Sequence, residues 1–153
     1  MPRLSKGFTM VELIAIMVIA SILATSVIGS YNNYNHWQDI NEQTLDMLNT
    51  LRRARDYSMA ANEKFYLSVD IDDDTYTLKY KDAKEALNLP GETSNVFTMP
   101  NYVDFTTTAS DVGTDLEFNI LGELTATETK TIAINTDERT ITIVSPTGYI
   151  YVQ

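Results

Sequence analysis

The sequence contains no cysteine, which excludes disulfide bonds and metal sites built on thiolates. It contains a single histidine, which argues against a zinc or di-iron centre that needs several imidazoles. The six glycines are scattered singly and form no loop that could cradle a phosphate. These absences argue against a metalloenzyme and a nucleotide-dependent enzyme. A Ser-His-Asp hydrolase needs its three residues to converge, and the one histidine, His36, is predicted to lie beside a membrane and away from any cleft of the head. We therefore expect neither catalysis nor a cofactor.

Basic residues are also scarce, with 11 Lys and Arg against 21 Asp and Glu, a formal net charge of −10. Proteins that bind nucleic acid through its phosphates need a basic surface, so we expect no nucleic-acid partner. Arg52, Arg53 and Arg55 form the main basic cluster. We interpret this cluster as a solvated helix face on which Arg52 pairs with Asp56, four residues later.

One long apolar run, residues 8–29, contains a single charged side chain, Glu12. As a helix the run would span roughly 33 Å, close to the thickness of about 30 Å of a bilayer's hydrocarbon core. Arg3 and Lys6 precede it, and no Lys or Arg follows before Arg52. The positive-inside rule then places the N-terminus in the cytoplasm and the remainder across the membrane. We therefore predict a transmembrane helix over residues 8–29.

Two other interpretations of this run stay open. A secretory signal peptide would have a shorter apolar core and a small-residue cleavage motif, which Ala20–Ser26 matches weakly. An ordinary single-pass anchor would place Glu12 near the lipid headgroups. Glu12 is hard to place in the core of a signal peptide. A carboxylate inside a spanning helix costs about 2.5–3.5 kcal/mol, so a Glu12 within the membrane is expected to have a partner.

The segment Gly7–Ile14, GFTMVELI, resembles the processing site of type IV prepilins and type II secretion pseudopilins. The resemblance implies that a membrane prepilin peptidase cuts after Gly7 and methylates the new N-terminal Phe8. Glu12 then becomes the fifth residue of the mature chain, the position that this family reserves for glutamate. Cleavage would expose an α-amine at Phe8, and Glu12 can pair with the amine of a neighbouring subunit, which relieves two buried charges together.

The same resemblance implies where the protein is found and what it contacts. Expected partners are the prepilin peptidase, other pilin or pseudopilin subunits, an inner-membrane assembly platform and membrane lipid. The expected location is the bacterial inner membrane, crossed once, with a periplasmic or extracellular head, and then a filament. The sequence departs from the family pattern at Ser21, where glycine is frequent, and at Gly29, where proline is frequent.

Residues 30–62 continue the helical pattern as an amphipathic helix that ends near Asn62. The side chains predicted to face a core recur at spacings of three and four: Tyr34, Trp37, Ile40, Thr44, Leu48, Leu51, Ala54, Ser58 and Ala61. Trp37, with Tyr31 and Tyr34, is also suited to anchoring at the membrane interface.

Beyond residue 64 the period of the pattern changes to two, which predicts an antiparallel β-rich head over 63–153. The clearest hairpins join Phe65–Ile71 to Tyr76–Tyr80 and Thr131–Asn135 to Thr140–Val144. Further predicted strands are Val96–Met99, Val103–Thr107, Leu116–Ile120 and Tyr149–Val152, and Lys81–Leu89 is predicted to form a short helical turn.

The predicted fold is therefore α+β and pilin-like, with a long N-terminal helix, half transmembrane and half amphipathic, packed on an antiparallel β-sheet head. It comprises a leader peptide (1–7), a transmembrane and filament-core helix (8–29), an amphipathic helix (30–62) and the head (63–153).

Asp70, Asp72, Asp73 and Asp74 are candidate calcium ligands, because hard oxygen donors suit that ion. The segment lacks the glycine and the terminal glutamate of an EF-hand loop. We interpret it as a solvated turn and predict no metal.

Two segments of the head resemble the minor pseudopilin H and FimT-like group. They are Phe118–Leu124, with its F-x-x-x-G pattern, and Ile141–Ile150, with Gly148 before the last strand. This resemblance implies a minor structural subunit of a secretion pseudopilus or a pilus. The alternative is a tip-located binding module that recognises an exported substrate or surface ligand. An exposed groove between Leu116–Leu124 and the loop around Pro90 would favour that alternative.

Overall fold

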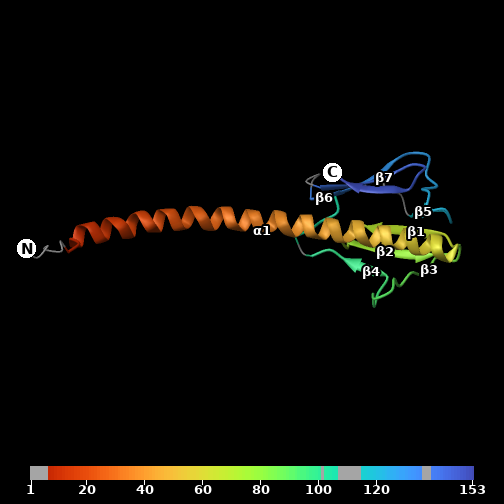
Figure 1. Cartoon of the computed structure of the whole chain (residues 1–153), viewed down its shortest axis with the longest axis horizontal. Coiled ribbons are helices and arrows are strands. Elements are labelled where there is room, and N and C mark those ends of the chain that lie inside the picture. The colour runs from red at the N-terminus through yellow and green to blue at the C-terminus, as the bar shows by residue number, and fades with distance from the viewer. Residues whose placement is uncertain (1–6, 101, 107–114, 136–138) are drawn as a thin grey trace, which may run out of the picture. The chain divides into compact units, whose positions relative to one another are not determined.

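The computed structural model describes residues 7–100, 102–106, 115–135 and 139–153, without the side chains of 26–30. The chain divides into two compact units, Met1–Trp37 and Gln38–Gln153, which we describe separately. One helix, α1 (Met10–Ala61), contributes to both units, and all strands belong to the second (Figure 1).

Helix α1 ends at Ala61 because the next residue leaves the helical conformation. Asn62 has a φ of 57°, in the left-handed region that asparagine tolerates better than most residues. The Glu63 N–H donates to the Ser58 carbonyl at 3.1 Å, and the Ser58 hydroxyl donates to the Glu63 carbonyl. These contacts close the last turn of α1 next to Asn62, where the sequence predicted that the helix would end.

The first sheet is antiparallel and contains β1 (Phe65–Asp70), β2 (Thr75–Tyr80), β3 (Glu85–Ala86), β4 (Val96–Thr98) and β5 (Leu116–Phe118). Its strand order is β3-β2-β1-β5, and β4 also pairs with β2. The predicted first hairpin is confirmed, with β1 and β2 paired from Phe65↔Tyr80 to Asp70↔Thr75.

The second sheet contains β6 (Lys130–Ile134), β7 (Arg139–Val144) and β8 (Tyr149–Val152) in that order, all antiparallel. The predicted hairpin between Thr131–Asn135 and Thr140–Val144 is confirmed, and so is the last strand. Residues 136–138, in the turn of this hairpin between β6 and β7, lie outside the described residues.

Two local predictions were wrong. Lys81–Leu89 is not a helical turn, because Lys81 and Lys84 have φ values of 59° and 54° and turn the chain back to place β3 beside β2. Val103–Thr107 forms no strand in its described part, and Phe105 makes only an isolated bridge to Ile134. Val103 and Phe105 are both buried, so their alternation reflects burial in the core rather than pairing in a ladder. Thr107 lies outside the described residues.

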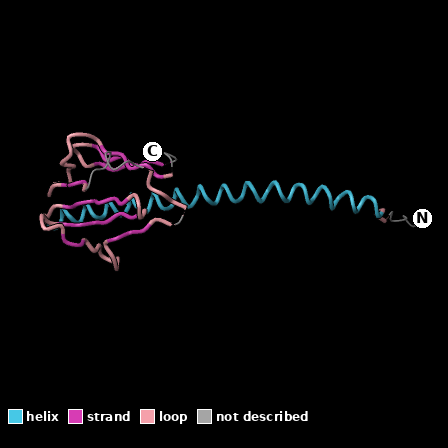
Figure 2. The backbone as a smooth tube through the Cα atoms, turned by 180° about the vertical axis from the view of Figure 1, so that it is seen from behind, coloured by secondary structure: helices cyan, strands magenta, loops and turns pink. Residues whose placement is uncertain are grey.

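The core of the second unit forms where α1 meets both sheets (Figures 1 and 2). Phe65 of β1 stacks on Phe118 of β5 with ring centroids 4.7 Å apart, and both side chains are fully buried. The predicted helix face is confirmed by the burial of Ile40, Thr44, Leu48, Leu51, Ala54 and Ser58. Met47 and Thr50 are also buried, although the predicted face did not include them. They are buried because a helix that contacts two sheets buries a wider surface than a helix on one sheet. The prediction was wrong for Tyr34, Trp37 and Ala61, which are exposed. Tyr34 and Trp37 precede the second unit, and Ala61 is the last residue of the helix.

Candidate functional site

The first turn of α1 is organised by Thr9 and Glu12. The Glu12 N–H donates to the Thr9 Oγ1 at 3.2 Å, and the Thr9 N–H donates to the Glu12 Oε2 at 3.5 Å. The Leu13 N–H donates to the Thr9 carbonyl at 3.2 Å and starts the helical ladder. This reciprocal pair is a capping box, in which each side chain satisfies a backbone donor of the other residue. The Thr-x-x-Glu spacing could have revealed it in the sequence.

The predicted cleavage site lies just before this cap. Gly7, Phe8 and Thr9 are not helical, and the Phe8 side chain is 73% exposed. A Cβ placed on Gly7 would have no atom within 4 Å, so nothing described here packs against that residue. Residues 1–6 of the predicted leader, with Arg3 and Lys6, lie outside the described residues.

Glu12 is the acidic residue of the first helical turn and is exposed. A negative charge there is favourable, because the N-terminus of a helix carries partial positive charge. Its carboxylate therefore supports the start of α1 within its own chain. The pairing of Glu12 with the α-amine of a neighbouring subunit stays a prediction.

The helix that follows carries apolar side chains on all its sides. Its exposed large apolar residues are Met10, Val11, Leu13, Ile14, Ile16, Met17, Val18, Ile19, Ile22 and Leu23. The hydroxyls of Ser21 and Thr25 donate to carbonyls of the same helix, at 2.7 Å to Met17 and 2.8 Å to Ile22. Such a surface favours an apolar surrounding, either lipid or other helices, over water.

Among the residues that the structure describes, no helix is both long enough and apolar enough to cross a membrane. The transmembrane segment over 8–29 stays a prediction.

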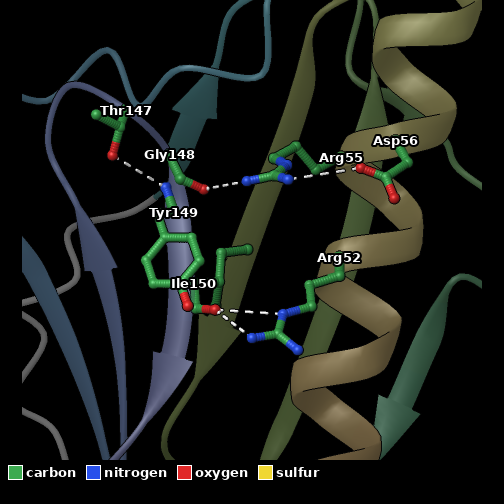
Figure 3. Close-up of polar contacts among 7 residues, drawn as sticks. All are labelled: Arg52, Arg55, Asp56, Thr147, Gly148, Tyr149 and Ile150. Carbon is green, nitrogen blue, oxygen red and sulfur yellow. Dashed lines mark hydrogen bonds and ion pairs between the residues drawn. The ribbon is translucent and has the colours of Figure 1, made fainter.

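The arginine cluster of α1 forms only part of the solvated face that the sequence predicted: Arg53 is exposed, whereas Arg52 and Arg55 are partly buried. Arg52 donates from Nε and Nη2 to the Ile150 carbonyl, at 3.2 and 2.7 Å, and Arg55 donates to the Gly148 carbonyl at 2.8 Å (Figure 3). Asp56 pairs with Arg55 at 3.6 Å, so the predicted pairing of Asp56 with Arg52 is corrected. These two arginines attach the last strand to the helix.

The carbonyl of Ile150 is available because β8 is the outer strand of its sheet. Gln153 exchanges hydrogen bonds with Thr140 of β7, so by alternation the Ile150 backbone points away from β7. An open strand edge of this kind can pair with another chain unless something covers it. Arg52 covers it here, which gives the arginine a structural role that no pattern within the helix could reveal.

The two glycines of the head motifs meet in the structure. Gly122 and Gly148 have φ values of 75° and 62°, and a Cβ on Gly148 would lie 1.9 Å from the Gly122 carbonyl oxygen. Gly122 in turn packs against α1, where an added Cβ would lie 2.8 Å from the Met59 sulfur. The F-x-x-x-G segment and the glycine before the last strand therefore form one contact that only glycine permits.

A groove of about 450 Å³ lies between α1 and the edge of the first sheet at β4. Tyr76 and Phe97 stack in it with ring centroids 4.8 Å apart, and burial raises the pKa of Tyr76 to about 12. Its polar lining includes Gln43, Asp46, Asn49, Thr50, Arg53, Glu92, Thr93 and Ser94. Loop residues beside Pro90 line it, but no residue of 116–124 does, so this groove is not the predicted one.

The aspartates of the β1–β2 turn serve the backbone. The Asp70 carboxylate accepts the N–H groups of Asp72 and Asp73, and the Asp74 carboxylate accepts that of Phe105 at 2.9 Å. In the part of the chain that the structure describes, no three His, Cys, Asp or Glu side chains converge as a metal site.

Ion pairs join the strands of the first sheet. Lys79 and Lys84 both contact Asp115, and Lys64 contacts Asp82 and Glu117. Partial burial alone would raise the pKa of Asp115, but the hydrogen bond from Lys84 and the charges of both lysines together lower it. These contacts neutralise part of the acidic excess and connect β5 to β2.

Comparisons with known proteins agree with this description. The family model "Prokaryotic N-terminal methylation motif" matches residues 2–28. No curated protein sequence matches the chain significantly.

Among solved structures, the chain is similar to two crystal forms of the type IV minor pilin FimU from Pseudomonas aeruginosa. One has a TM-score of 0.55 and 12% identity and covers 74% of this chain and 91% of that one. The other has a TM-score of 0.56 and 14% identity and covers 80% and 92%. The minor pseudopilin EpsH of the Type 2 Secretion System of Vibrio cholerae has a TM-score of 0.57 and 14% identity and covers 75% and 96%. Together these results show a pilin-type N-terminal motif on a pilin-like fold.

Proposed function

We propose that this chain, with its pilin-like fold and N-terminal methylation motif, is a structural minor subunit of a type IV pilus or a type II secretion pseudopilus. The observation that carries the proposal is the exposed, non-helical Gly7–Phe8 bond directly before a capped apolar helix. A prepilin peptidase cleaves after Gly7 and methylates Phe8. The chain is the substrate of that enzyme and not an enzyme itself.

The apolar surface of α1 is suited both to lipid, before assembly, and to the helices of other subunits, after it. Before assembly, lipid of the inner membrane covers the exposed side chains between Met10 and Leu23, and the head lies in the periplasm. During assembly, helices of other pilin or pseudopilin subunits replace the lipid, guided by the inner-membrane platform. Glu12 sets the register because its charge needs the α-amine of a neighbouring Phe8 in that apolar surrounding.

The first test is the mass of the mature N-terminus and the fate of Glu12→Ala. We expect N-methylated Phe8 as the first residue of the native chain. Glu12→Ala should insert in the membrane, but those of its molecules that have been processed should enter filaments poorly. Glu42→Ala, which removes an exposed carboxylate further along α1, should assemble normally. A retained Met1 would contradict the processing step, and normal assembly of Glu12→Ala would contradict the role in register.

The groove beside β4 favours a second candidate function, in which the head also recognises an exported substrate or surface ligand. The outer edge of β4 adjoins this groove, and its walls offer amides, hydroxyls and the Arg53–Glu92 pair, whose atoms lie 3.1 Å apart. Thr93→Trp, at the exposed rim, would obstruct the groove without altering α1. Loss of substrate secretion or ligand binding with normal assembly would support recognition by the groove. Unchanged secretion and binding would show that the groove takes no part in recognition.

A further inference from the structure

We propose that the capping box of Thr9 and Glu12 keeps the Gly7–Phe8 bond outside the helix, so that both are positioning residues for removal of the leader. This inference rests on the proposed function, because it concerns how the chain is presented to the prepilin peptidase. It assigns Glu12 a role in the uncleaved chain, before any neighbouring subunit is present.

The geometry determines where the helix starts. A capping residue adopts a non-helical backbone conformation, and the helix begins at the residue after it. Here the Thr9 hydroxyl accepts the Glu12 N–H at 3.2 Å, and α1 begins at Met10. The Glu12 carboxylate accepts the Thr9 N–H at 3.5 Å, which satisfies a second backbone donor. Gly7 and Phe8 therefore remain upstream of the cap.

Without the cap, the helix has a reason to extend towards the leader. In an apolar surrounding, unsatisfied backbone groups are costly, and a further helical turn is the simplest way to satisfy them. Extension by three residues would draw Thr9, Phe8 and Gly7 into the helix. Since peptidases act on exposed segments whose backbone is not engaged in a helix, this extension would hide the bond. The open surroundings of Gly7 and the 73% exposure of Phe8 are consistent with accessibility in the capped state.

The capping role and the assembly role of Glu12 have different chemical requirements. A capping box needs an acceptor at this position, which glutamine supplies as well as glutamate. Pairing with an α-amine needs the negative charge, which glutamine lacks. Glu12→Gln should therefore preserve processing and impair assembly, whereas loss of the Thr9 cap should impair processing first.

The experiment follows cleavage of the full-length chain co-expressed with a prepilin peptidase, using intact-mass spectrometry at early time points. Thr9→Val removes the hydroxyl with little change in shape, and we expect cleavage about two- to fivefold slower, the effect of losing a typical cap. Thr9→Asn caps a helix without a hydroxyl and should restore the wild-type rate. Glu12→Gln should also be cleaved at the wild-type rate.

Thr25→Val is the matched control, because it makes the same substitution in the same helix at a hydroxyl that donates to the Ile22 carbonyl, away from the first turn. It should not alter cleavage. Equal rates for Thr9→Val and the native chain would overturn the inference while leaving the proposed function intact. Slow cleavage of Thr9→Asn would also overturn it, since the peptidase would then be reading the threonine itself. A native chain that is not cut after Gly7 would instead refute the proposed function.

Discussion

Gly148 and Gly122 approach each other more closely than residues with side chains could. An added Cβ on Gly148 would lie 1.9 Å from the carbonyl oxygen of Gly122, and both residues have positive φ values. The turn that carries Gly122 is held by Asn119, whose side-chain oxygen accepts the N–H groups of Leu121 and Glu123 at 2.9 and 3.0 Å. Asn119 thus fixes the turn in the position where Gly122 contacts Gly148, the residue just before β8.

We expect Gly148→Ala to lower the free energy of unfolding by at least about 2 kcal/mol, because it adds a steric clash to backbone strain. Gly91→Ala is the control: Gly91 has a φ of 92° but no atom within 4 Å of an added Cβ, so only strain of about 1–2 kcal/mol applies. Urea unfolding of the purified chain, followed by circular dichroism, compares the two. Equal losses would show that the close approach contributes nothing.

The residue with the strongest predicted role, Glu12, was identifiable from sequence because a lone carboxylate in an apolar run is unusual. Its contact with Thr9 was also encoded locally, at a spacing of three residues. The meeting of Gly122 and Gly148 was not, since the two glycines are distant in sequence and share only a turn conformation.

Among the elements, helix α1 carries three arginines that are close in sequence but contact different parts of the head. Arg52 and Arg55 both bind carbonyls of the last strand and its turn, whereas Arg53 points to the Pro90 loop and pairs with Glu92 (Figure 3 shows the first two). Residues one position apart on a helix face different directions. The cluster therefore connects one helix to two separate parts of the head.

This arrangement predicts different costs for the same substitution. Arg52→Met removes two charged hydrogen bonds to a strand edge and should lower the free energy of unfolding by about 1.5–3 kcal/mol. Arg53→Met removes an ion pair with Glu92 and a hydrogen bond to the Pro90 carbonyl, both exposed to solvent, and should cost below about 1 kcal/mol. Thermal or urea unfolding of both variants under identical conditions provides the measurement. A larger loss for Arg53→Met would contradict the role of Arg52 in attaching β8.

Strands joined by short turns were predictable, because alternation of apolar and polar residues on either side of a turn specifies a hairpin. β3 was not, since its two residues, Glu85 and Ala86, carry no pattern of their own. Its pairing depends on Lys81 and Lys84 adopting left-handed conformations, which lysine rarely does without tertiary support.

At the scale of the whole molecule, the two units expose different surfaces. Residues 7–25 expose large apolar side chains throughout, whereas the buried core side chains all belong to residues 38–153. Among the described residues, the buried core therefore lies entirely within Gln38–Gln153, which comprises the second part of α1 and the strands. The first unit gains stability only from its own helix and from whatever surrounds it.

A chain that begins at Gln38 should consequently fold by itself. In the same detergent, we expect its thermal midpoint to lie within about 4 °C of that of the full chain, a difference of roughly 1 kcal/mol or less. It should also remain monomeric without detergent, whereas the full chain should need it. Loss of a cooperative transition in the shortened chain, measured by calorimetry, would show that residues before Gln38 contribute to the core.

The sequence by itself determined the N-terminal motif, the apolar helix, the end of α1 near Asn62 and the main hairpins. Each of these depends on residues close together in the chain, such as Thr9 and Glu12 or the two strands of a hairpin. Only the tertiary structure decided that Arg52 and Arg55 hold the last strand, that Gly122 meets Gly148, and that a groove lies beside β4. Those features join segments far apart in sequence, and the folding of the whole core selects their contacts.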